Sequence, residues 1–157
     1  MRELVANEKK SLGFCNSGFS LLEVLVAIAI LSVGILATAS MQGAASRSNV
    51  IADTRTKATT LAADRIEKLM TLSWTDADLA DADGDGQSGL GDTDFDNDPS
   101  TQGDADHRVI DGKYTIYWNV ADNVPITNTK TLRVIVMWQL QGVQGKVSME
   151  RVIPRII

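Results

Sequence analysis

Aspartates at alternate positions are the residues of this 157-residue chain whose types and spacing could do chemistry. In the stretch DADGDGQSGLGD, positions 1, 3, 5, 7 and 12 of an EF-hand calcium loop are occupied by Asp81, Asp83, Asp85, Gln87 and Asp92. In such a loop alternate carboxylates converge on one ion, the seventh position lends a backbone carbonyl, and a glycine, here Gly86, permits the sharp bend. The spacing therefore predicts calcium as a cofactor of this loop.

A solvated acidic loop is the alternative interpretation of the same stretch. Asp92 stands where the standard pattern has glutamate, and no helical pattern flanks the loop as it would in an EF-hand pair. A second, overlapping cluster follows, made of Asp92, Asp94, Asp96 and Asp98. Loops of this length either have a function or remain disordered, so both interpretations stay open. Protease resistance that increases with calcium would distinguish them.

Glu23 is a carboxylate in an unusual position. It begins a run, Val24 to Ser46, that contains no charged residue and exceeds the roughly 20 residues that a helix needs to span a bilayer. A carboxylate in hydrocarbon costs about 3 kcal/mol or more, so such residues tend to mark function. Three interpretations compete: a signal peptide cut at residues 37–39, a plain membrane anchor, or a chain that is cut ahead of the apolar run.

The third interpretation gives Glu23 a role, because GFSLLEVLVAIAIL resembles the N-terminal signal of type IV prepilins and pseudopilins. The resemblance implies that a prepilin peptidase cleaves the Gly18–Phe19 bond and methylates the new amino group of Phe19. It also implies that Glu23 pairs with the Phe19 amine of a neighbouring subunit during assembly. Residues 1–18 would be the leader, and they contain the only cysteine, Cys15, so the processed chain would have no thiol.

The pattern beyond the apolar run predicts that the helix continues. No proline occurs between Phe19 and Trp74. Apolar residues recur at near-helical spacing, namely Ile51, Ala58, Leu61, Ala62, Ile66, Leu69 and Leu72. We therefore expect a helix whose first part is wholly apolar and whose second part packs one stripe against a folded domain.

The C-terminal third of the chain reads as antiparallel sheet. Apolar residues alternate in three segments: Tyr114, Ile116, Trp118 and Val120; Leu132, Val134, Val136, Trp138 and Leu140; Val147, Met149 and Ile153. A further strand is expected near residues 107–110, and His107 is expected in solvent. The apolar face of the sheet needs a cover, which the helical stripe supplies. The predicted fold is α+β.

The order of these segments resembles that of a whole type IV pilin. It divides the chain into a leader (1–18), a transmembrane and assembly helix (19–46), an amphipathic helix (47–74), an Asp/Gly-rich loop (75–108) and a sheet (109–157). The stretches LAADRIEKL and YTIYWNVADNVPITNTKTLRVIVMW resemble minor pilins of the PilV type. That resemblance implies a subunit that aids pilus assembly or adhesion, with other pilins as partners. The alternative is a minor pseudopilin of a type II secretion system.

The resemblance to type IV pilins also implies a cellular location, and the composition of the chain argues against some functions. The resemblance implies a single pass through the inner membrane, with the N-terminus cytoplasmic and the C-terminal domain periplasmic, followed by transfer to an extracellular pilus. The formal net charge of −5 argues against nucleic acid and anionic lipid surfaces as partners. No Ser/His/Asp set with elbow glycines and no phosphate loop occurs, so the sequence predicts a protein that is not an enzyme.

Overall fold

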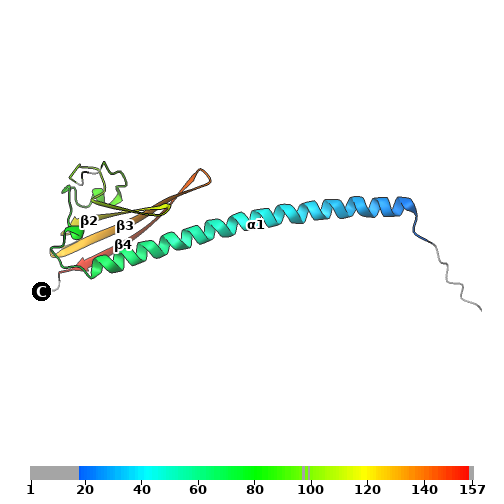
Figure 1. The fold of residues 1–157 in the computed structure, drawn as a ribbon. Helices are drawn as coiled ribbons and strands as arrows, with labels where there is room; N and C mark the ends of the chain where they lie inside the picture. Colours follow the sequence, from blue (N-terminus) through cyan, green and yellow to red (C-terminus); the bar gives the residue numbers. More distant parts are fainter. Residues whose placement is uncertain (1–17, 97, 99, 156–157) are drawn as a thin grey trace, which may run out of the picture. The chain divides into compact units, whose positions relative to one another are not determined.

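The computed structural model describes residues 18–96, 98 and 100–155, which fall into two compact units divided between Ala45 and Ser46 (Figure 1). Of the predicted leader, residues 1–17, which include Cys15, lie outside the described part of the chain. Helix α1 (Leu21–Met70) begins in the first unit and ends in the second.

In the first unit, the large apolar side chains of α1 are exposed. Phe19 is 83% exposed and Leu36 is 71% exposed, and this segment is long and apolar enough to cross a membrane. The hydroxyl groups in it donate to carbonyls one turn earlier, as Ser32 Oγ does to Ile28 O at 2.7 Å. Such bonds satisfy hydroxyls within the helix itself, which suits a segment surrounded by hydrocarbon.

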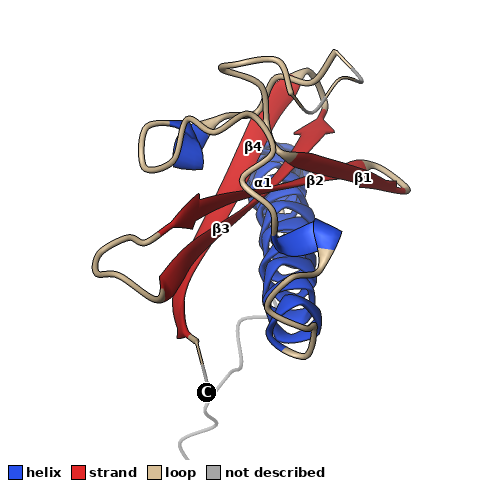
Figure 2. Cartoon of the chain, turned by 90° about the vertical axis from the view of Figure 1, so that its left-hand side faces the viewer, coloured by secondary structure: helices blue, strands red, loops and turns tan. Residues whose placement is uncertain are grey.

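The second unit contains a four-stranded antiparallel sheet. Its strands are β1 (His107–Asp111), β2 (Tyr114–Asp122), β3 (Thr129–Leu140) and β4 (Val143–Pro154), and they lie side by side in chain order. The part of α1 in this unit packs on one face of the sheet (Figure 2). Two short 3-10 helices, η1 (Ala77–Leu79) and η2 (Gly89–Gly91), interrupt the long loop between α1 and β1.

The core lies between α1 and the alternating apolar residues of the strands. Ala58, Ala62, Ile66 and Leu69 are buried on the helix side. On the sheet side the buried residues are Tyr114, Ile116, Trp118, Val120, Leu132, Val134 and Val136. The predicted stripe and the predicted strand faces are confirmed, and β1 is the further strand expected near residues 107–110.

Two predictions about single residues were wrong. Ile51 is 56% exposed because it precedes Thr54, the first helix residue that is buried in this unit. His107 does not rest in solvent, because it pairs in register with Trp118 and its ring stacks on the indole at 4.9 Å between centroids. Burial lowers the pKa of His107.

Candidate functional site

Gly18, Phe19 and Glu23 lie at the start of α1. Gly18 and Phe19 precede the helix and are exposed, whereas Glu23 is in its first turn, where the helix dipole favours a negative charge. Leu22, Val26 and Ile30 line the same open surface of the helix as Glu23, and all of them are exposed. Residues 18–45, the described part of the first unit, include no lysine or arginine that could pair with Glu23.

Asp81, Asp83 and Asp106 form the second candidate site. Each offers one carboxylate oxygen, and the three atoms lie within 4.8 Å of one another. Asp106 is only 3% exposed, and its two oxygens accept backbone N–H groups from Ala82 at 2.6 Å and from Val120 at 2.8 Å. It therefore joins the acidic loop to strand β2, and the set could hold a metal ion.

Tight turns bring the other two carboxylates to this point. Asp81 Oδ1 accepts from the N–H of Gly84 at 2.9 Å, and Asp83 Oδ2 accepts from the N–H of Gly103 at 3.2 Å. Gly84 and Gly86 have φ angles of 75° and 61°, in the left-handed region that favours glycine. The bend predicted at Gly86 is therefore present, and a Cβ at Gly86 would lie 3.8 Å from Asp81 Oδ2.

The carboxylates of this loop repel one another. Burial and the charge of Asp83 raise the pKa of Asp85 to about 6. Burial raises the pKa of Asp106 to about 6, with Asp81 and Asp83 adding to the effect against two backbone hydrogen bonds that lower it. Burial and neighbouring acids also raise the pKa of Asp81 and of Asp92. A bound cation would reverse this balance by favouring the charged forms.

The sequence-predicted metal residues are only partly brought together. Asp81 and Asp83 belong to the close set, and Asp85 and Asp92 lie near enough for their charges to interact with Asp83. Gln87 is exposed. Asp106 lies beyond the EF-hand spacing and was missed, and its signal in the sequence is its position directly ahead of β1, where the loop returns to the sheet.

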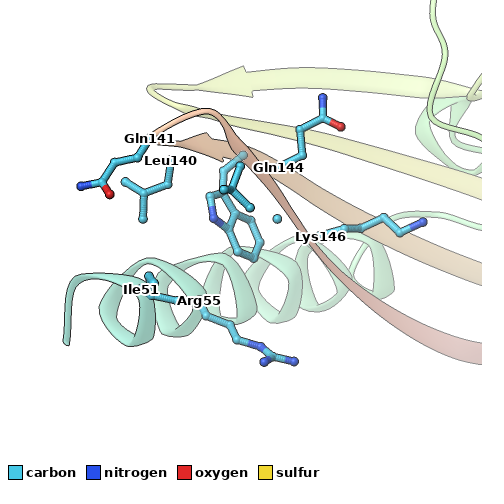
Figure 3. A pocket seen from close by; sticks show the side chains of 9 residues that line it. Ile51, Arg55, Leu140, Gln141, Gln144 and Lys146 are labelled. Carbon is cyan, nitrogen blue, oxygen red and sulfur yellow. The ribbon is translucent and has the colours of Figure 1, made fainter. Parts of the chain in front are cut away.

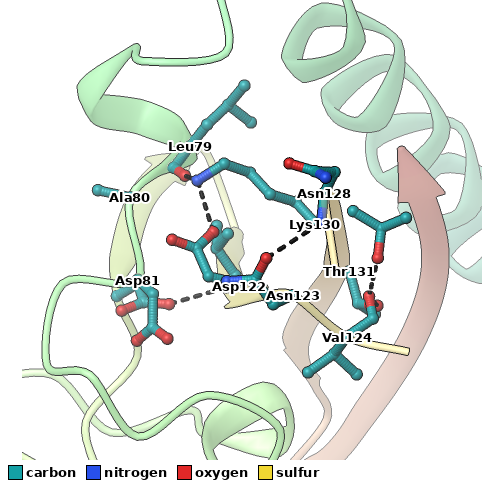
Figure 4. Close-up of polar contacts among 12 residues, drawn as sticks. Leu79, Ala80, Asp81, Asp122, Asn123, Val124, Asn128, Lys130 and Thr131 are labelled. Carbon is teal, nitrogen blue, oxygen red and sulfur yellow. Dashed lines mark hydrogen bonds and ion pairs between the residues drawn. The ribbon is translucent and has the colours of Figure 1, made fainter. Parts of the chain in front are cut away.

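Side chains of the sheet fix the entry to this loop. The carbonyl oxygens of Asp78, Leu79 and Ala80 lie 2.9, 2.7 and 3.1 Å from the side-chain nitrogens of Trp118, Lys130 and His107, respectively. Lys130 also pairs with Asp122 at 2.6 Å, and Figure 4 shows its ammonium between that carboxylate and the Leu79 carbonyl. Three consecutive carbonyls are thus held from three strands, immediately before Asp81.

Comparison with known proteins gives one match. Residues 14–39 match the family described as the prokaryotic N-terminal methylation motif, and this range contains Gly18, Phe19 and Glu23. No curated protein and no solved structure matches the chain. The match implies processing of the N-terminus by a prepilin peptidase, and the matched range covers the first candidate site.

Proposed function

We propose that this chain is a type IV pilin-like protein and a minor structural subunit of a type IV pilus, a proposal that its methylation motif supports. The observation that supports this most is the register of three features. Gly18 and Phe19 lie directly ahead of the helix, a single carboxylate, Glu23, lies in the first turn, and the helix then continues uncharged to Ser46.

Cleavage of the Gly18–Phe19 bond creates an ammonium group at Phe19. Two opposite charges then stand at the start of an apolar helix, and each is costly in hydrocarbon unless it is paired. In the proposed filament, Glu23 of an incoming subunit pairs with the Phe19 amine of a neighbour. Because each subunit supplies one charge of each sign, the contact repeats from subunit to subunit and sets the axial register.

The minor-pilin assignment is supported by sequence features of the second unit. The stretches LAADRIEKL and YTIYWNVADNVPITNTKTLRVIVMW, which resemble type IV pilus modification protein PilV, form the buried helix stripe and strands β2 and β3. In this role the subunit is anchored in the inner membrane with its second unit in the periplasm. It then enters the pilus with other pilins and aids assembly or adhesion.

Mass spectrometry of filaments sheared from cells tests this proposal. We expect a peptide that begins at N-methylated Phe19, at trace stoichiometry relative to the major pilin. The same peptide found only in membranes would contradict a role in pili. A chain that still carries residues 1–18 in both fractions would contradict processing itself.

A minor pseudopilin of a type II secretion system is the second candidate. The observation that favours it is that the methylation motif is shared by both classes, and Glu23 would act in the same way. Deletion of the gene separates the two: a pseudopilin is needed for release of secreted enzymes, whereas a pilus subunit is needed for piliation. Neighbouring pilus or secretion genes provide a cheaper first indication.

We further propose that the acidic loop binds calcium. Asp81, Asp83 and the buried Asp106 would supply the close oxygens, with Asp85, the carbonyl of Gln87 and Asp92 completing the shell. A flexible Asp/Gly loop that offers only oxygen ligands suits calcium better than magnesium, which demands a rigid octahedron. Calcium would also stabilise the loop, because the ion would neutralise the mutual repulsion of these carboxylates.

Limited proteolysis with calcium or with chelator tests the loop. We expect protection at calcium concentrations on the order of 10⁻⁴ to 10⁻³ M, the range typical of extracellular modules. Asp83→Asn should abolish the protection. The matched control is Asp98→Asn, because Asp98 is exposed and, among the described residues, its carboxylate accepts from the N–H and hydroxyl of Ser100. Identical digestion with calcium and with chelator would overturn the proposal.

A further inference from the structure

We propose that a groove in the second unit, between the start of its helix and the β3–β4 hairpin, binds the headgroup of an anionic phospholipid in the membrane that the apolar segment crosses. This inference goes beyond the role in a filament. It requires only that the chain is anchored in a bilayer, so it holds for a pilin and for a pseudopilin alike.

The groove has a volume of about 410 Å³ and an apolar interior. Ile51 on α1 and Val143 on β4 are 56% and 70% exposed. Leu140 on β3 lines the same groove, and Figure 3 shows it on the hairpin side, facing the helix that carries Ile51. Large apolar side chains left this open usually mark a surface that meets a partner or a membrane. The residues that line the groove include no aspartate or glutamate.

Trp138 forms a fixed wall of the groove. It pairs in register with Gly145, and a Cβ at residue 145 would lie only 2.3 Å from the indole carbons. The missing side chain therefore lets the ring lie close on β4, while Tyr114 packs edge-on at 6.2 Å. Tryptophan is enriched where a protein crosses the boundary between hydrocarbon and water, so this wall suits the headgroup level.

Two cations border the groove on the side away from the start of the helix. Arg55 and Lys146 are exposed, and Figure 3 shows both side chains extending along the helix toward its C-terminal end, beyond Ile51 and Leu140. Apolar groups thus come first along the axis and positive charge comes next. The net charge of −5 argues against anionic surfaces for the whole chain, but this end of the unit is locally basic.

The groove begins close in sequence to the end of the uncharged run. The second unit starts at Ser46, where this run ends, and Ile51 follows five residues later. Five residues span at most about 18 Å even when fully extended, so the start of the groove lies within that distance of the end of the run. This is close enough for the groove to reach the headgroup layer beside the segment that crosses the membrane.

Charge decides between a lipid and a second copy of the chain. The uncharged helix of another copy could cover Ile51 and Val143, but it would leave Arg55 and Lys146 without counter-charges. A lipid phosphate supplies the negative charge while its glycerol and acyl portions cover the apolar wall. Basic residues near an anionic leaflet are attracted to it, which favours the lipid.

The experiment uses the full chain with Cys15→Ser and one nitroxide label, reconstituted in vesicles. The label is placed at Val143→Cys or, as the matched control, at Ile126→Cys. Ile126 is 65% exposed, and it precedes β3 whereas Val143 follows it, so the two positions lie at opposite ends of that strand. Collision of the label with oxygen, which enters lipid, is compared with collision with a water-soluble nickel chelate.

In vesicles of phosphatidylethanolamine with phosphatidylglycerol, we expect the oxygen-to-chelate ratio at residue 143 to rise several-fold over that at residue 126. The rise should vanish in phosphatidylcholine and in the variant with Arg55→Glu and Lys146→Glu. Equal ratios at the two positions would overturn the proposal, as would a rise that is independent of lipid charge. Protection from both reagents with spin–spin broadening would show a second copy instead. No peptidase or filament is involved, so the result is independent of the pilus assignment.

Discussion

Leu36 in the first unit is 71% exposed, whereas Leu132 in the second is fully buried, although both lie within regular secondary structure. The second unit covers its apolar side chains with its own helix and sheet. The described residues of the first unit, 18–45, include no strand that could cover the helix, so its apolar surface is open to a membrane or to other molecules. One part of the chain therefore covers its apolar side chains on folding, and the other leaves them exposed.

The two units also differ in whether they provide partners for a carboxylate. Asp106 is buried and has backbone donors for both oxygens within its own unit. Glu23 stands among apolar side chains in a unit whose described residues include no lysine or arginine. The fold thus provides hydrogen-bond donors for Asp106, whereas Glu23 depends on an intermolecular contact in the proposed filament.

The largest expected effect is the loss of stability when a buried leucine of the second unit, rather than an exposed leucine of the first, is replaced by alanine. Leu132→Ala should lower the free energy of unfolding of the second unit by about 2–5 kcal/mol, because it removes a fully buried side chain and leaves a cavity. Leu31→Ala, at a position that is 61% exposed in the first unit, should leave this transition unchanged. Urea titration of the full chain in mild detergent, followed by tryptophan fluorescence, measures both. A similar loss from the two variants would contradict independent stabilisation.

The next effect concerns the buried cation of the second unit. Lys130 is 6% exposed and donates to Asp122 and to the Leu79 carbonyl, so Lys130→Met should cost about 1.5–3 kcal/mol through lost charge-assisted hydrogen bonds. Arg133→Met removes a partly exposed ion pair with Glu150 and should cost about 1 kcal/mol or less. The same urea titration compares the two variants. Equal losses in the free energy of unfolding would contradict the view that Lys130 holds the loop through the Leu79 carbonyl.

The smallest effect is the response of the acidic cluster to pH without calcium. The pKa of Asp106 is about 6 in the folded state against an ordinary 3.8, so the folded state binds more protons between pH 7 and pH 5. Stability should therefore rise as the pH falls through this window, by about 1 kcal/mol from Asp106 alone. Saturating calcium should abolish or reverse the trend, because the ion favours the deprotonated carboxylates. Urea titrations at the two pH values, with and without calcium, measure this.

Asp85→Asn provides the control for the pH response, because Asp85 is less buried than Asp106 and its pKa is also about 6. The variant should show a smaller gain in stability on acidification than the parent chain. If the variant and the parent respond identically, the repulsion attributed to the cluster does not act through Asp85.

Much of the fold could be predicted from sequence periodicity. The helical stripe ending in Leu69 and the alternation from Tyr114 to Val120 depend only on which side chains are apolar, and both were confirmed. The exposure of Ile51 and the burial of His107 could not be predicted in this way. They depend on where the sheet ends over the helix and on which residue lies opposite in the neighbouring strand.

The two candidate sites also differ in how far local sequence alone predicts them. Gly18, Phe19 and Glu23 form a local pattern, so the sequence alone identified them. The acidic cluster combines the local spacing of Asp81 and Asp83 with Asp106, which joins them only because the loop returns to β2. Lys130 was missed for the same reason, since its contact with Leu79 spans 51 residues of sequence.

The proposed role of Glu23 in filament assembly is tested most directly by replacing it with alanine. Cells would express the variant beside the parent chain, and mass spectrometry would follow its N-terminus in membranes and in sheared filaments. We expect the Glu23→Ala chain to be cleaved normally to N-methylated Phe19 in the membrane and to be absent from filaments. Its matched control, Glu67→Ala, removes an exposed carboxylate from the second half of α1 and should enter filaments normally. Normal incorporation of Glu23→Ala would contradict the role of Glu23 in assembly.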